Sequence, residues 1–333
     1  MNTNVTSNKI KDSTRYNIFP IENDDTWQFV QDSYAMYWVA GEIQRDLATD
    51  SDDVIALKPD EQHLLFQTLS FFATGDYIVN QNLNTSFYHD VEKLNNLEAV
   101  YFYDFQRMIE NVHSHVYAML LQFYVKDITY RQQLIDGIKN NPVIKKKAEW
   151  CLNHFGTPEQ QISFPERLIA QACTELIGFS GSFCIIFWFA RQNKFKGLKK
   201  ANQLISRDEG LHGQFACHMY KKIGSPLQQD HVKQIINDFV NIEIEYIKYI
   251  LPHKLLGLNS DNMTQYIKYM ANYLMTNLNY PAIYPNITNP FDFMEAISIG
   301  VRSTDFFKKE TSDYRKANSN IVDTDDLKLE FGK

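Results

Sequence analysis

Glycine and proline are scarce in this chain, with 13 and 10 copies among 333 residues. Few turn-forming residues, together with apolar residues that recur at intervals of three and four, favour an all-helical protein. Hydrophobic residues make up 44% of the sequence, which is enough for one large core or two modest domains.

Basic charge and cysteine are also in short supply. The formal net charge is −7 and no segment concentrates lysine or arginine, so nucleic-acid binding has little support. The four cysteines show neither CxxC nor zinc-site spacing. We therefore expect reduced, buried thiols at Cys151, Cys173, Cys184 and Cys217.

Apolar runs suited to a signal peptide or a membrane span are lacking too. The N-terminal sequence MNTNVTSNKIKDSTRYN has no apolar core. The most apolar stretch, residues 178–190, is too short to cross a bilayer and is closed by Arg191. These features predict a soluble, cytoplasmic protein with no membrane partner.

The chain does contain long segments with helical periodicity. We expect a flexible N-terminal arm at 1–25, one helical domain at 26–302 and a flexible C-terminal tail at 303–333. Within the domain, the main helices are predicted at 27–47, 58–86, 98–125, 165–192, 199–223, 226–256 and 261–278.

Two of the predicted helices carry the motif Glu-x-x-His, as Glu110/His113 and Glu209/His212. Asp76 precedes the first motif by 34 residues, and Glu175 precedes the second by the same 34 residues. A carboxylate at a matched offset in both halves indicates a diverged duplication.

This spacing has a structural meaning. Two long helices joined by a short turn bring positions about 30–35 residues apart back to one height. Two such hairpins would gather four carboxylates and two imidazoles in the centre of a bundle. Two divalent cations would neutralise the four carboxylates, and mixed carboxylate and imidazole ligands suit iron or manganese better than structural zinc.

Several longer motifs resemble one known family, the small, radical-generating subunit of class I ribonucleotide reductase of the eukaryotic and viral type. The similarity runs from about Arg15 to the C-terminus. It rests on RYNIFPI, ALKPDE, FFATGDYIVNQNL, ENVHSHVY, FSGSFCIIFW, LISRDEGLH and NPFDFME. The resemblance implies a ferritin-like helical bundle with a di-metal carboxylate centre.

The resemblance also implies a role for each residue of the centre. One ion would be bound by Asp76, Glu110 and His113, and the other by Glu175, Glu209 and His212. The metals would be two iron ions, oxo-bridged when oxidised, with manganese as the alternative. Tyr117 matches the radical tyrosine of the family. Without the resemblance, a tyrosine in this apolar helix would suit an ordinary packed aromatic residue. The apolar pocket that shields the radical matches Phe179, Phe183 and Ile205.

In the family, the radical passes to a separate large subunit that reduces ribonucleotides to deoxyribonucleotides. The matching relay positions are Trp38, Asp208 and Tyr314, with His113 linking the relay to the metal. On sequence alone Trp38 also suits a plain core residue. The C-terminal tail would dock on the large subunit, unless it is merely a disordered end. The resemblance further implies a homodimer and O2 as the oxidant.

Two other functions deserve comparison. A related di-metal oxidase or iron-handling protein would share the bundle, but Tyr117, Trp38, Asp208 and the tail argue against it. A non-catalytic companion subunit should have lost metal ligands, and all six are present.

Overall fold

The computed structural model describes residues 15–83, 87–156, 162–191, 194–252, 254–255 and 257–294. Within these ranges every regular element is a helix, and Leu255 and Leu258 form an isolated bridge. The prediction of an all-helical protein is confirmed. The predicted tail, 303–333, lies outside the described residues.

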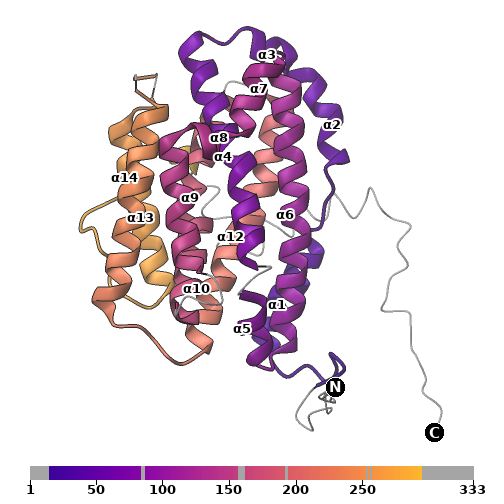
Figure 1. The fold of residues 1–333 in the computed structure, drawn as a ribbon, viewed down its shortest axis with the longest axis vertical. Helices are drawn as coiled ribbons and strands as arrows, with labels where there is room; N and C mark the ends of the chain where they lie inside the picture. The colour runs from indigo at the N-terminus through magenta and orange to yellow at the C-terminus, as the bar shows by residue number, and fades with distance from the viewer. Residues whose placement is uncertain are drawn as a thin grey trace, which may run out of the picture.

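Four helices of more than 20 residues dominate the bundle (Figure 1): α4 (Pro59–Asn82), α6 (Leu97–Tyr124), α12 (Lys196–Lys222) and α13 (Gln229–Ile250). A fifth long segment consists of α10 (Phe164–Cys173), a π-helical turn η3 (Thr174–Gly178) and α11 (Ser180–Ala190). The remaining helices are α1 (Asp24–Ala35), α2 (Gly41–Leu47), η1 (Ala48–Asp50), α3 (Ser51–Ile55), α5 (Tyr88–Lys93), α7 (Ile128–Ile135), α8 (Gly137–Asn140), α9 (Pro142–Phe155) and α14 (Ser260–Asn277).

Local sequence signals mark where the site-bearing helices begin. The backbone N–H of Lys58 donates to Glu61 Oε2 at 2.9 Å, and Pro59 occupies the first turn of α4. Asn96 caps α6 by accepting from the backbone N–H of Ala99 at 3.0 Å. These starts agree with the helices predicted at 58–86 and 98–125.

The two predicted hairpins are present as packed pairs. Helix α4 packs along α6, and α10 packs against α12. Helices α9, α13 and α14 cover one side of the bundle, while α1 and α2 lie beside α6 on the other (Figure 1). The motif-bearing helices therefore occupy the interior.

Two predicted helices are interrupted. The helix expected at 27–47 is broken between Ala35 and Gly41, and the intervening segment places Trp38 in the core. The helix expected at 165–192 contains the π-helical turn, in which the N–H of Phe179 donates to the carbonyl of Thr174 at 3.2 Å. Periodicity alone missed both, because neither a short break nor one extra residue per turn disturbs an apolar run.

The same apolar segment, Phe164–Ala190, is long and apolar enough to cross a membrane, which the shorter stretch at 178–190 is not. Its most apolar window is 94% buried inside the bundle. Burial on all sides is typical of a central helix in a soluble protein, as the sequence predicts.

Candidate metal centre

Helix α6 presents a buried polar stripe to the centre of the bundle. Glu110, His113 and Tyr117 follow one another at three- and four-residue spacing, so they share one face of the helix. All three are at most 1% exposed. Helix α12 contributes Glu209 and His212 in the same way, both buried.

The structure brings all six predicted ligands together as two groups that share Glu110. Ligand atoms of Asp76, Glu110 and His113 lie within 4.8 Å of one another. The second group, within the same distance, consists of Glu110, Glu175, Glu209 and His212. The two halves of the predicted duplication therefore meet in space, and Glu110 belongs to both groups.

Glu110 and Glu209 both reach the two imidazole rings. His212 Nδ1 lies 2.7 Å from Glu209 Oε2 and 3.0 Å from Glu110 Oε1. His113 Nδ1 lies 2.9 Å from Glu209 Oε1 and 3.4 Å from Glu110 Oε2. These two glutamates therefore have the geometry of carboxylates that serve both halves of the centre.

Burial sets the charge balance of the centre. Burial, followed by the charge on Glu110, raises the pKa of Asp76 well above its usual value. Burial and the charge on Glu209 do the same to the pKa of Glu175. Burial opposes charge on the histidines as well, but Glu209 and the other carboxylates raise the pKa of His113 and bring that of His212 to about 9. The carboxylates therefore favour the charged form of both imidazoles, whereas burial favours the neutral form of Asp76 and Glu175.

Two glutamines support the carboxylates and were missed by the sequence analysis. Gln106 Nε2 donates to Glu175 Oε1 at 3.1 Å and lies 3.3 Å from Glu110 Oε1. Gln171 also donates to Glu175 Oε1, and Asn82 donates to Gln171 Oε1 at 2.8 Å. Because Gln106 and Gln171 each precede a predicted ligand by four residues, helical spacing could have found them.

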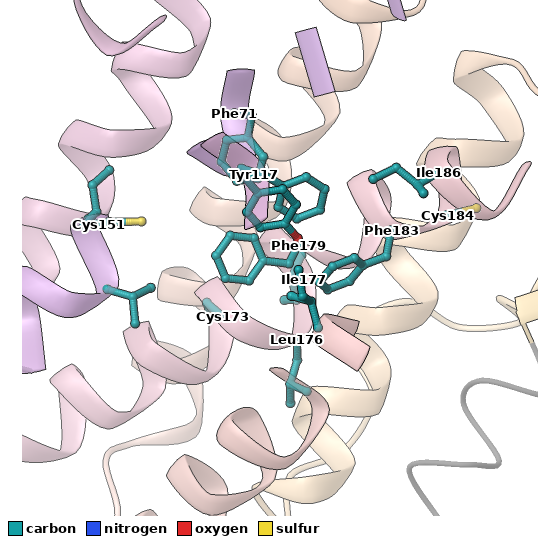
Figure 2. Packing of buried hydrophobic residues seen from close by; sticks show 14 of the residues in the cluster. Phe71, Tyr117, Cys151, Cys173, Leu176, Ile177, Phe179, Phe183, Cys184 and Ile186 are labelled. Carbon is teal, nitrogen blue, oxygen red and sulfur yellow. The ribbon is translucent and has the colours of Figure 1, made fainter. Parts of the chain in front are cut away.

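Tyr117 lies among aromatic rings, and its hydroxyl has no hydrogen-bond partner (Figure 2). Figure 2 shows Phe179 and Phe183 beside it, as predicted for the shielding pocket. Ile205 is fully buried in the same core. Burial, followed by the charge on Asp76, raises the pKa of Tyr117 well above its usual value. Both effects favour the protonated phenol.

A hydrogen-bonded chain connects His113 with Trp38. Trp38 Nε1 donates to Asp208 Oδ2 at 2.7 Å, and His113 Nε2 lies 3.1 Å from the same oxygen. The rings of Trp38 and His113 stack at a centroid distance of 5.9 Å. Burial opposes the charge on Asp208, but Arg207 and His113 lower its pKa below the usual value. Trp38, Asp208 and His113 are thus in contact, while the third predicted relay residue, Tyr314, lies outside the described residues.

A sequence profile of the family described as "Ribonucleotide reductase, small chain" matches residues 15–290. The chain belongs to this family. Subunit M2 of ribonucleoside-diphosphate reductase from Rattus norvegicus is 42% identical over 302 residues, which cover 91% of this chain and 75% of the rat protein. The small chain of Variola virus is 42% identical over 306 residues, covering 92% of this chain and 93% of its own.

Solved structures agree with this assignment. The ribonucleotide reductase Rnr4 homodimer from Saccharomyces cerevisiae matches with a TM-score of 0.71 and 28% identity, covering 92% of this chain and 91% of that one. A putative class I ribonucleotide reductase from Bacillus halodurans matches with a TM-score of 0.74 and 20% identity, covering 82% of this chain and 99% of that one. The second likeness concerns the fold alone. The predicted ferritin-like bundle is confirmed.

As a small chain of ribonucleoside-diphosphate reductase, the protein is a subunit of an oxidoreductase. The residues of the centre fit a metal pair. Buried carboxylate oxygens of Asp76, Glu110 and Glu175 have no hydrogen-bond partner and face a site that already holds two imidazoles. Buried carboxylate oxygens without a hydrogen-bond partner are groups that bound cations would satisfy. The chain thus has the cluster of a di-metal centre.

Proposed function

We propose that this chain generates and stores a tyrosyl radical at Tyr117 and passes it to a large subunit that reduces ribonucleotides to deoxyribonucleotides. The observation that carries the proposal is the overlap of two carboxylate and imidazole groups next to a buried phenol that has no hydrogen-bond partner. The metals would be two iron ions, with manganese as the alternative.

Each half of the centre would hold one ion. Asp76, Glu110 and His113 would bind the first, and Glu175, Glu209 and His212 the second. Glu110 and Glu209, which lie near both imidazoles, would be available to both ions. When bound, the ions supply the oxidising power for radical formation, with O2 as the oxidant. Gln106 and Gln171 hold Glu175 in place by hydrogen bonds.

The environment of Tyr117 explains why the radical would be both formed and retained there. Because burial and the carboxylates disfavour the phenolate, the hydroxyl must lose its proton together with the electron, which leaves a neutral phenoxyl radical. The apolar side chains of Phe179, Phe183 and Ile205 exclude water and reductants from that radical.

Transfer to the large subunit would use the chain from His113 through Asp208 to Trp38. Asp208 keeps its negative charge and accepts from Trp38 Nε1, so it can take the indole proton when the ring is oxidised. We place Tyr314 next in the relay and assign docking on the large subunit to the tail at 303–333. We also propose a cytoplasmic homodimer, the assembly named for the yeast Rnr4 structure.

Electron paramagnetic resonance (EPR) spectroscopy tests this proposal. Metal-free protein is loaded with ferrous iron, exposed to O2 and compared with a Tyr117→Phe variant treated in the same way. We expect a tyrosyl signal in the wild type alone. If no signal forms with iron or manganese, or if the variant keeps the signal, the proposal is wrong. Parallel loading with each metal decides between iron and manganese.

A further inference from the structure

A buried lysine lies behind the metal centre and contacts none of its six candidate ligands. Lys147 on α9 is 2% exposed, and its ammonium forms an ion pair with Glu243 Oε2 of α13 at 2.5 Å. The ammonium also donates to the carbonyl of Gly178 at 2.7 Å. Burying an ion pair seldom adds more stability than apolar residues of the same volume. The contacts of this pair with the neighbouring backbone therefore suggest a role other than stability.

The acceptor, Gly178, is the last residue of the π-helical turn that contains Glu175. A Cβ added at this position would lie 2.9 Å from Phe239 Cζ and 3.5 Å from Lys147 Cε. The missing side chain therefore lets the Phe239 ring of α13 pack directly on this backbone, beside Lys147. A π-helical turn lacks the regular α-helical bonding pattern, and such turns occur frequently at functional sites.

Glu243 contacts the next turn of the same segment. A Cβ at Gly181 would lie 3.1 Å from Glu243 Oε1, so this carboxylate also rests against the backbone. The two members of the ion pair thus hold the chain directly after Glu175 from two helices, α9 and α13.

Lys147 also supports the aromatic wall beside Tyr117. Its ammonium lies 3.4 Å from the centroid of the Phe71 ring and 4.6 Å from that of Tyr246. The Phe71 ring packs against Phe179 at a centroid distance of 5.7 Å. Figure 2 shows Phe71 and Phe179 close to Tyr117. One cation therefore touches both the backbone that carries Glu175 and the wall of the tyrosine pocket.

We propose that Lys147, paired with Glu243, is a positioning residue that holds the π-helical turn in place and so sets the location of Glu175 in the metal centre. This inference rests on the proposed function, because it assigns Glu175 to a bound metal. The pair acts through the backbone of Gly178 and Gly181, at a distance from the ions.

The test is a titration of the metal-free protein with Mn(II). Binding is measured as the loss of the EPR signal of free Mn(II). We expect the wild type to bind two ions. In the double variant Lys147→Met/Glu243→Leu no buried charge is left alone, so it should fold. We expect this variant to bind one ion about ten- to a hundredfold more weakly and the other unchanged.

The chain offers a matched control on the same two helices. Lys146 and Glu245 form the neighbouring ion pair between α9 and α13, with about half of each side chain exposed. The same substitutions there should leave both ions bound as in the wild type. If Lys147→Met/Glu243→Leu also binds both ions normally, the positioning role is wrong. If the wild type binds no pair of ions, the proposed function itself fails.

A second variant covers the case in which the double variant does not fold. Lys147→Arg keeps the positive charge for Glu243, but a planar guanidinium cannot take the place of the compact ammonium between Phe71 and Gly178. In metal-free protein we expect faster amide hydrogen exchange at 174–183 only. Faster exchange spread equally over α4, α6 and α12 would indicate a purely structural role and overturn the proposal.

Discussion

The rings of Phe72 and Tyr117 are stacked, with centroids 4.5 Å apart and planes within 3° of parallel. Phe72 also packs against Phe183 at 5.0 Å and Phe179 at 5.8 Å. It therefore joins the tyrosine to the two phenylalanines that the sequence analysis assigned to the shielding pocket. Phe72 itself was missed, because it lies on α4 and no local pattern links it to α6.

Substituting Phe72 by leucine should shorten the lifetime of the radical at Tyr117. The smaller side chain loses the stacked face and leaves space through which water can reach the phenol, at a cost of about 1 kcal/mol in stability. The decay of the tyrosyl EPR signal measures the effect. Phe102→Leu is the matched control, since Phe102 is equally buried and stacks on Phe215. Equal decay rates in the two variants would contradict this prediction.

Trp38→Phe should separate radical storage from radical transfer. The variant loses the Nε1 donor to Asp208, while Asp208 keeps its contacts with His113 and Arg207. We expect a tyrosyl EPR signal of normal intensity and a loss of ribonucleotide reduction in the presence of the large subunit. Normal turnover in this variant would show that Trp38 is only a core residue.

Glu98 should make folding stability depend on pH. Burial opposes its charge, but hydrogen bonds from the Glu22 N–H, Arg15 and Asn23 lower its pKa below the usual 4.5. Because the folded-state pKa is the lower one, the stabilisation is present above about pH 4.5 and is lost as the pH falls through the folded-state pKa.

The variant Glu98→Gln tests this effect by urea unfolding. At pH 7 it should be less stable than the wild type by about 2 kcal/mol, since hydrogen bonds to a charged group are lost. The difference should shrink as the pH is lowered toward 3. If the difference in unfolding free energy does not change with pH, the substitution acts through the shape of the side chain and not through its charge.

Asp50 should contribute strongly to stability because it joins the two motif-bearing helices. Its carboxylate accepts from the Tyr124 hydroxyl of α6 at 2.6 Å and from the N–H groups of Gly197 and Leu198 of α12 at 3.0 and 2.9 Å. Asp50→Ala leaves these three buried donors unpaired and should cost about 3 kcal/mol or more. Tyr124→Phe removes one donor and should cost only about 1 kcal/mol. Thermal unfolding measures the loss of stability in each variant. Equal losses in Asp50→Ala and Tyr124→Phe would contradict the role of Asp50 as a bridge between the helices.

The sequence by itself determined the helical class, the starts of α4 and α6, and the six candidate ligands that the structure brings together. These features depend on local propensity and on the spacing of polar residues within apolar helices, which one chain displays directly. Gln106 and Gln171 could also have been identified from the sequence, because they lie four residues before Glu110 and Glu175. The residues Trp38, Asp208, Phe179, Phe183 and Ile205 came from the family resemblance, and their assigned roles stay predictions.

Only the tertiary structure decided which side chains meet across helices. The stack of Phe72 on Tyr117, the bridge made by Asp50 and the buried pair of Lys147 with Glu243 each join residues from separate elements. The π-helical turn is also a tertiary result, because the packing of α9 and α13 around Gly178 holds a backbone geometry that helical periodicity does not specify. Contacts between distant segments depend on how whole helices pack, and a repeat within one helix carries no information about that.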